Sequence, residues 1–258
     1  LQQVGAPDPQ ARLGEIFPAT FAMVAQAHCA RWGTTLEQMA RVSVKNHDHG
    51  ALNPLAQFNK RVTLAEVLGS PMVADPLTLL ACCPNSDGAA ALVLRARPTS
   101  DRSVRVSGSA LTSGSYAPLR DLTVWECEQR AAREAYAQAG VTPAQVDVVE
   151  VHDAFTICEI VHCEALGLCP PGQGGAMVES GDSALGGRVP VNPSGGLLAR
   201  GHPPGASGVA QVVEIVTQLR GEAGERQVQG ARIGVAQIIG GSLEGDAQAC
   251  TVHVLARR

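Results

Sequence analysis

Aromatic side chains are scarce in this sequence: Phe, Trp and Tyr together make up 3% of its 258 residues. The core must be built from Val, Leu, Ile and Ala, because apolar residues still account for 45%. No apolar run approaches the roughly 20 residues of a membrane span, and the first residues lack the layout of a signal peptide. The net charge of −4, with no basic run, gives no electrostatic reason to bind nucleic acid. We expect a soluble, cytoplasmic protein.

Zinc-type spacing is also missing among the eight cysteines. Cys158 and Cys163 do not form a C-x-x-C pair, and the adjacent Cys82 and Cys83 are poor partners for each other. A chain of this size without a secretion signal is expected to keep its thiols reduced and buried as small hydrophobes. The most C-terminal of them, Cys250, lies in an expected strand and is read as a core residue.

A metal site is weighed at one place only. His47 and His49 flank Asp48, but the spacing is compact and no cluster of thiols or carboxylates accompanies it. We therefore predict no metal.

Apolar periodicity and capping residues predict helices and strands that alternate along the chain. Helices are expected at 17–32, 36–45, 63–68, 124–139, 156–166 and 209–219, and strands at 104–108, 147–151, 232–239 and 249–255. The small residues after Asn85 are expected to pass into a further strand at Leu92-Val93-Leu94. This alternation implies a layered α/β domain with a sheet buried between helices.

Glycines and prolines surround His202 in the stretch from Asn192 to Gly208, which leads directly into a helical pattern. Glycine allows close approach to the main chain, and proline stiffens the loop. A rigid histidine before a helix suits general acid–base chemistry. A tight turn in which His202 only hydrogen-bonds to backbone remains the alternative.

A second polar cluster begins at His152, directly after the strand expected at 147–151. Ligands of open α/β sheets bind at the carboxyl ends of strands, so both histidines are expected to face one cleft. In such a cleft one imidazole could hydrogen-bond a substrate oxygen while the other moves a proton.

The motifs Asn192-Pro-Ser-Gly-Gly-Leu and Gly201-His-Pro-Pro-Gly-Ala-Ser-Gly208 closely resemble the signature of the thiolase superfamily. The form is closest to the sterol-carrier-protein-linked thiolases and their lipid-transfer-protein relatives. The resemblance extends to Lys45-Asn-His…Asn-Pro54, to Ser86-Asp-Gly-Ala-Ala90 and to His152-Asp-Ala-Phe155. It implies the α/β class, with a layered α/β/α thiolase core and a helical loop domain.

By this resemblance, residues 1–80 are a loop domain preceded by a linker. Residues 81–102 complete an N-terminal core domain, and residues 103–258 form the C-terminal core domain. His202 would activate the nucleophile and form the oxyanion site, and His152 would orient the thioester oxygen or a water. The supporting residues would be Asp153, Phe155, Glu159, Asn192, Gly240 and Gly241, and the substrate-binding residues Gly195, Gly196, Gly201 and Ser207. For Asp153 a structural role is weighed equally.

Two features depart from the family. The nucleophilic cysteine of thiolases lies before the loop domain, and no motif here matches it, so the chain is expected to lack that N-terminal part. Many thiolases also carry a cysteine near the C-terminus, where this chain has Gln237-Ile-Ile-Gly-Gly-Ser242. Relatives that cleave steroid side chains by retro-aldol chemistry lack the nucleophile and tend to use tyrosine, but Tyr116 and Tyr136 lie in no motif.

The resemblance implies an acyl-CoA C-acyltransferase that cleaves 3-ketoacyl-CoA thiolytically or runs the reverse Claisen condensation. One alternative is a retro-aldolase acting on a steroid side chain or acyl-CoA thioester with a small OB-fold acyl-CoA-binding subunit. Another is a non-catalytic subunit that binds CoA esters. Acyl-CoA and coenzyme A are expected as substrates, with no other cofactor, and a homodimer is expected from the family.

Overall fold

The computed structural model describes residues 17–98, 100, 102–115, 121–241 and 249–257. Their centre is a four-stranded mixed sheet in the order β3-β6-β5-β4. The strands are β3 (Val104–Thr112), β4 (Val148–Glu150), β5 (Ile233–Gly240) and β6 (Ala249–Arg257). β6 pairs antiparallel with β3 and β5, whereas β4 pairs parallel with β5. The predicted α/β class is confirmed.

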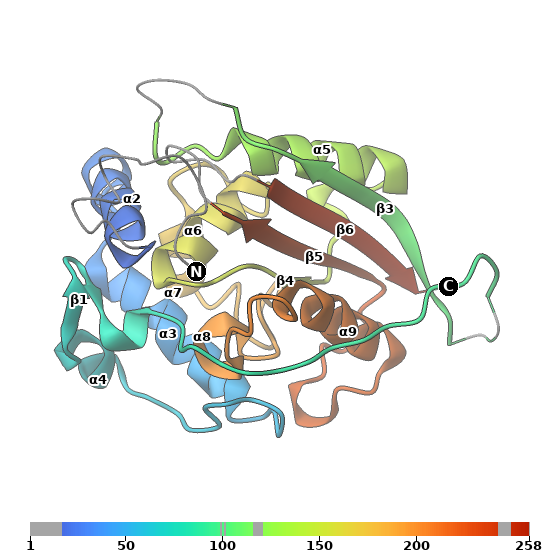
Figure 1. The fold of residues 1–258 in the computed structure, drawn as a ribbon, viewed down its shortest axis with the longest axis horizontal. Helices are drawn as coiled ribbons and strands as arrows, with labels where there is room; N and C mark the ends of the chain where they lie inside the picture. The colour runs from blue at the N-terminus through green and yellow to red at the C-terminus, as the bar shows by residue number, and fades with distance from the viewer. Residues whose placement is uncertain (1–16, 99, 101, 116–120, 242–248, 258) are drawn as a thin grey trace.

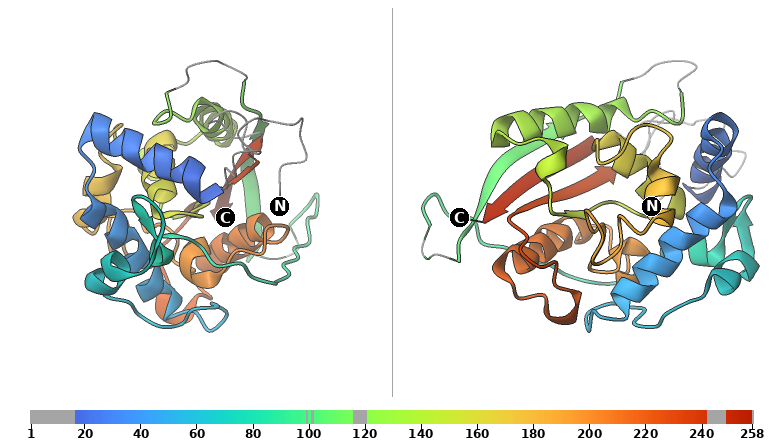
Figure 2. Two further views of the ribbon diagram at one scale, coloured as in Figure 1. Left: turned by 60° about the vertical axis from the view of Figure 1, so that its left-hand side comes forward. Right: turned by 180° about the vertical axis from the view of Figure 1, so that it is seen from behind.

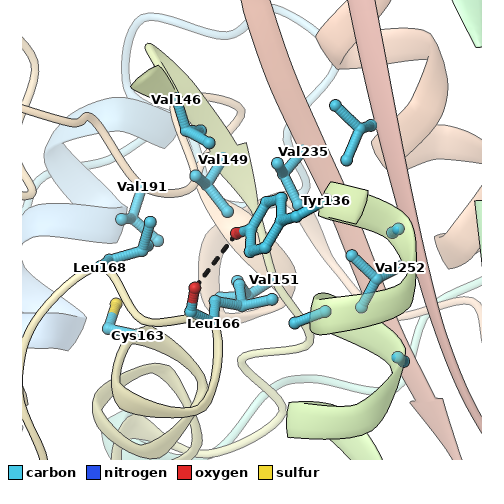
Figure 3. Packing of buried hydrophobic residues seen from close by; sticks show 14 of the residues in the cluster. Tyr136, Val146, Val149, Val151, Cys163, Leu166, Leu168, Val191, Val235 and Val252 are labelled. Atoms are coloured by element: carbon cyan, nitrogen blue, oxygen red, sulfur yellow. Dashed lines mark hydrogen bonds between the residues drawn. The ribbon is translucent and has the colours of Figure 1, made fainter. Parts of the chain in front are cut away.

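Helices cover both faces of this sheet (Figure 1). On one face α5 (Glu126–Ala139) and α6 (Thr156–Ala165) pack on Val149, Val235 and Val252, where Tyr136 donates to the carbonyl of Leu166 at 3.1 Å (Figure 3). On the other face α9 (Ser207–Arg220) packs on alternate residues of the same strands, which are Val148, Ala236 and Leu255. Successive strand residues point to opposite faces, so the nearly continuous Val, Ile and Leu runs reflect a sheet buried on both sides.

The first part of the described chain is mainly helical, with α2 (Phe17–Trp32), α3 (Leu36–Gly50), α4 (Leu64–Gly69), the short pair β1 (Met72–Ala74) and β2 (Leu77–Thr78), and the 3₁₀ turn η1 (Leu79–Ala81). Thr35 and Thr63 cap α3 and α4 through capping boxes. α3 contacts α6, α7 (Gly174–Glu179) and α8 (Gly196–Arg200), and lies beside the segments that follow β4 (Figure 2). Two further 3₁₀ turns are η2 (Pro143–Gln145) and η3 (Gly224–Arg226).

Three expectations from periodicity differ from the structure, and the first is β3, which continues to Thr112, four residues beyond its expected end at Gly108. α3 continues to Gly50, five residues beyond the expected end at Lys45, because the polar residues of its last turns find partners on other segments. The strand expected at 92–94 is absent from the described structure: these residues belong to no strand, and Val93 is 83% exposed. Among the described residues, no helix is long and apolar enough to cross a membrane.

Candidate active site

Two histidine rings meet beyond the carboxyl end of β4. His152 follows this strand, and His202 lies on the loop between α8 and α9. Their ring centroids are 5.0 Å apart, with the ring planes inclined by 85°. The structure therefore brings together the two imidazoles that the sequence motifs single out, at the edge of the sheet where α/β folds bind ligands.

The hydrogen bonds of His202 fix which ring nitrogen carries its proton. Its Nδ1 lies 2.8 Å from Oγ of Ser207, and the hydroxyl of Ser207 donates to the carbonyl of Pro203 at 2.9 Å. Because the single hydroxyl hydrogen is used on Pro203, Oγ accepts the hydrogen bond from Nδ1–H of His202. In the neutral ring the lone pair is then on Nε2, which can act as a base.

Both rings are neutral at physiological pH. Burial, followed by the charge of Arg200, lowers the pKa of His202 to about 4. Burial, followed by the charges of His202 and His162, lowers the pKa of His152 well below its usual 6.5. Because both imidazoles are neutral, each can accept a proton from a ligand without first having to be deprotonated.

His152 leaves one ring nitrogen available. Its main-chain N–H donates to Oε1 of Gln237 on β5 at 3.0 Å, which fixes the backbone after β4. Within the described part of the chain, Nδ1 of the His152 ring is buried and has no hydrogen-bond partner. A buried polar atom in this state is the exception in folded proteins and is a natural contact for a ligand atom.

The glycine-containing loop after Val191 is anchored to β4 by side chains. The amide oxygen of Asn192 accepts from the N–H of Val151 at 2.9 Å, and Asn192 itself adopts a positive φ of 56°. The N–H and hydroxyl of Ser194 both donate to Glu150, at 3.0 and 2.7 Å. These bonds join the loop that leads to His202 to the strand that leads to His152.

A buried charged network ties α3 to α6. Nζ of Lys45 forms an ion pair with Glu159 at 2.9 Å and donates to the carbonyl of Val191 at 2.7 Å, with the two ionic side chains 7% and 0% exposed. Oε2 of Glu159 accepts from the amides of Asn46 and Asn192 at 2.9 and 2.8 Å. A buried ion pair with this many hydrogen bonds holds its elements in one arrangement.

Asp153 connects this network to α8. Its carboxylate accepts from the side chain of Asn46 at 2.7 Å and from the N–H groups of Leu197 and Leu198 at 2.7 and 3.3 Å. Burial, followed by the charge of Glu159, raises the pKa of Asp153 to about 6. The carboxylate of Asp153 thus joins α3 to α8, and its role toward a substrate stays a prediction.

Comparison with known proteins identifies the family. The profile described as "Thiolase C-terminal domain-like" matches residues 108–256, more than half of the chain. The chain belongs to the thiolase family. It is 48% identical over 254 residues to an acetyl-CoA acetyltransferase of Methanothermobacter thermautotrophicus, covering 96% of this chain and 65% of that protein. It is 41% identical over 236 residues to sterol carrier protein 2 of Bos taurus, covering 87% of this chain and 44% of that protein.

Solved structures agree at the level of the fold. A structure named "Ltp2-ChsH2(DUF35) aldolase" matches with a TM-score of 0.80 and 23% identity, over 99% of this chain and 69% of the other. The thiolase-like layered fold is confirmed. This thiolase-family chain spans less than two thirds of the length of the two curated relatives described above.

The remaining predicted site residues of this thiolase-family chain lie at different distances from the histidines. Phe155 is buried and stacks on Phe21 of α2, with centroids 4.8 Å apart, so it anchors the helical segment. Gly240 and Gly241 lie at the exposed end of β5. A Cβ on Gly195 would contact Gly50, and one on Gly201 would contact Ser86, so these glycines permit close packing of the chain on itself. Their roles toward a substrate stay predictions.

Gly196 gives a direct test of this packing. It has a φ of 58°, and a Cβ there would overlap the carboxylate of Asp153. Gly196→Ala is expected to cost about 3 kcal/mol, because the strain of a positive φ, about 1 kcal/mol, is joined by the displacement of a buried carboxylate. Gly224→Ala is the matched control, since Gly224 has a φ of 62° and open space around it. Denaturant unfolding measures both; equal losses in the two variants would contradict the close contact with Asp153.

The histidines near the end of α3 have structural partners. Nε2 of His49 accepts from the N–H of Leu185 at 3.1 Å, so its Nδ1–H donates to the carbonyl of Asn192 at 3.0 Å. Burial, followed by the charge of Lys45, lowers the pKa of His49 to about 3. Among the described residues, no group of three or more His, Cys, Asp or Glu side chains could hold a metal ion.

Four of the thiols are unsuited to act as nucleophiles. All eight cysteines lie outside disulfides, and Cys158 and Cys163 on α6 are fully buried, which raises the pKa of both well above 9. Burial raises the pKa of Cys82 to about 11 and that of Cys83 to about 12. Since a thiolate is the nucleophile in thiol catalysis, none of these four has the character of one. Tyr136 is buried in the core of α5 and α6, whereas Tyr116 lies outside the described residues.

Several residues that bond around His152 have no role predicted from the sequence. His162 donates to its carbonyl, Glu128 binds His162, and Gln237 accepts from its N–H. The sequence contains one signal for Glu128. It shares the buried face of α5 with Ala131 and Ala135, which follow it at helical spacings of three and seven residues. A charged residue on an apolar helix face requires a buried partner.

Proposed function

We propose that the complete protein to which this chain belongs is an acyl-CoA C-acyltransferase of the thiolase type. The observation that carries the proposal is the pair of neutral imidazoles, His152 and His202, 5.0 Å apart at the end of β4. The relative named acetyl-CoA acetyltransferase, 48% identical over nearly the whole of this chain, supports acyl transfer between CoA thioesters. Acyl-CoA and free CoA are then the substrates.

In this proposal Nε2 of His202 takes the proton from a thiol supplied by the rest of the complete protein. The thiolate attacks the 3-keto carbon, and the bond between the second and third carbons breaks. The electron pair passes to the thioester oxygen as an enolate, which takes up a proton and leaves as acetyl-CoA. His152 holds that oxygen, or a water, through a ring nitrogen, and a second transfer moves the acyl group to CoA.

A retro-aldolase is the second candidate, supported by a structural neighbour whose name describes an aldolase with a DUF35 component. Such a reaction breaks a bond beside a hydroxyl group and needs no nucleophilic thiol. The proposal of a small acyl-CoA-binding partner belongs to this candidate, whereas a homodimer is proposed for either.

The deciding experiment offers the complete protein two substrates. With 3-ketoacyl-CoA and CoA, we expect loss of the ketoacyl thioester and matching release of acetyl-CoA. With 3-hydroxyacyl-CoA, we expect no aldehyde. Aldehyde release without acetyl-CoA formation would replace the acyltransferase by the aldolase. Binding of CoA in a calorimeter without turnover of either substrate would indicate a non-catalytic subunit.

A further inference from the structure

The main chain of His152 is held by side chains on both sides. Its N–H donates to Gln237, and its carbonyl accepts from the N–H of Ala154 at 3.0 Å and from Nε2–H of His162 at 3.0 Å. His152 lies just beyond β4, so the main-chain ladder of the sheet provides none of these bonds. The carbonyl of His152 therefore owes one of its two hydrogen bonds to the side chain of His162.

His162 is itself fixed by a carboxylate from another helix. Its Nδ1 lies 2.7 Å from Oε2 of Glu128 on α5, and the two side chains are 0% and 1% exposed. The indole of Trp125 packs edge-on against the imidazole, with centroids 4.8 Å apart. Because Nε2 must donate to a carbonyl, the bond from Nδ1 to Glu128 contains a second proton. The pair is thus either an imidazolium with a carboxylate or an imidazole with a carboxylic acid.

We propose that Glu128 and His162 are a positioning pair for His152: Glu128 holds His162, and His162 holds the carbonyl of His152, so that the His152 ring stays turned toward His202. Neither residue needs to touch a substrate, since both act through His152. The catalytic consequence rests on the acyltransferase function proposed above, whereas the effect on the His152 ring does not. Carboxylates that orient a functional histidine are known to matter for activity nearly as much as direct contacts.

The charges around the pair agree with this role. The titratable groups that act on His152 are His202, from the loop before α9, and His162, from α6; both lower its pKa, after the larger effect of burial. Tyr136, Cys158 and Cys163 surround Glu128 and are held neutral by burial, which raises the pKa of each. In the imidazolium–carboxylate form of the pair, the charge of His162 adds to burial and to His202 in lowering the pKa of His152.

Two variants of the complete protein separate charge from position. In Glu128→Gln the amide can donate to Nδ1, so His162 is neutral but still donates to the His152 carbonyl. The double variant Glu128→Leu with His162→Phe replaces the buried pair by apolar groups, keeps an aromatic ring against Trp125 and removes the donor. Glu164→Gln is the matched control. Glu164 lies on α6, as His162 does, and its carboxylate is 3.3 Å from a different buried histidine, His28.

The readouts are the titration of the His152 ring by nitrogen NMR and the rate of thiolysis. Glu128→Gln is expected to raise the pKa of His152. The double variant is expected to raise it as well and to lower kcat by about tenfold, with KM unchanged. The inference is overturned if both variants titrate like the wild type, or if Glu164→Gln shifts the curve equally. A shift in the pKa of His152 without a fall in kcat contradicts the positioning role. If the protein proves not to be a thiolase, the titration of His152 still decides whether the pair acts on that ring.

Discussion

Replacing His202 with alanine is expected to lower the rate of CoA-dependent thiolysis by the complete protein about 10³-fold while leaving it folded. A fall of this size is typical of an enzyme that loses its general base. His202 has this role in the proposed reaction because Ser207 holds its Nδ1–H, which leaves the lone pair on Nε2. The loop can lose the ring without collapse, since the ring is only partly buried and its backbone is held independently through Ser86. Steady-state kinetics on 3-ketoacyl-CoA give the rate, and circular dichroism confirms the fold.

The controls use the same chemistry elsewhere in the chain. Ser207→Ala keeps the ring but frees Nδ1, so a fall of only about tenfold is expected, because both tautomers become populated. His253→Ala removes another histidine that also contacts a serine, Ser109, at 3.0 Å across β3 and β6, and should leave the rate unchanged. A His202→Ala enzyme that retains its rate, or one that loses no more than His253→Ala, would exclude His202 as the base.

The pH profile adds an independent check. A base is active when unprotonated, and burial lowers the pKa of His202 to about 4. The rate should therefore be independent of His202 ionisation from neutral pH down to about pH 5, and should fall only as the pH drops through about 4. An ordinary histidine would give that fall near 6.5. A limb near 6.5 that disappears in the His202→Ala background would show that the ring is more exposed to water than in this structure.

The features of this site that the sequence predicts are those that depend on residues close together in the chain. The two histidines were predicted because each lies in a local motif beside a recognisable strand or helix, and the helix boundaries follow local signals such as the Thr35 and Thr63 caps. The resemblance to thiolases, confirmed by the family match, predicted the layered α/β core. The tautomer of His202 also depends on a contact only five residues away.

Interactions between distant segments were not predictable in the same way. Lys45 and Glu159 are on different helices, and only the folded chain shows that they form one buried pair. The same holds for Glu128 and His162, which no periodicity joins. The exposed run at Leu92-Val93-Leu94 shows the converse, since a local strand pattern does not create a strand without a neighbour to bond to.

Replacing Lys45 with methionine is expected to be the most destabilising of the substitutions considered. Methionine has a similar length but no charge, so Glu159 would stay buried without its cation, and the carbonyl of Val191 would lose its donor. Breaking a buried ion pair from one side costs about 3–5 kcal/mol. For a chain of this size that lowers the melting temperature by roughly 10 °C, which differential scanning calorimetry measures. Lys60→Met is the control, because Lys60 is exposed and its loss should change stability by less than about 0.5 kcal/mol.

A double-mutant cycle with Glu159 distinguishes the loss of the Lys45 charge from the loss of its packing. Adding Glu159→Gln to Lys45→Met removes the unpaired carboxylate while keeping an oxygen that accepts from Asn46 and Asn192. The double variant should therefore regain at least about half of the lost stability, with a coupling energy of about 2 kcal/mol between the two sites. Purely additive losses would mean that Lys45 stabilises α3 through packing of its stem alone. Recovery would instead show that the charge balance between Lys45 and Glu159 is what joins α3 to α6.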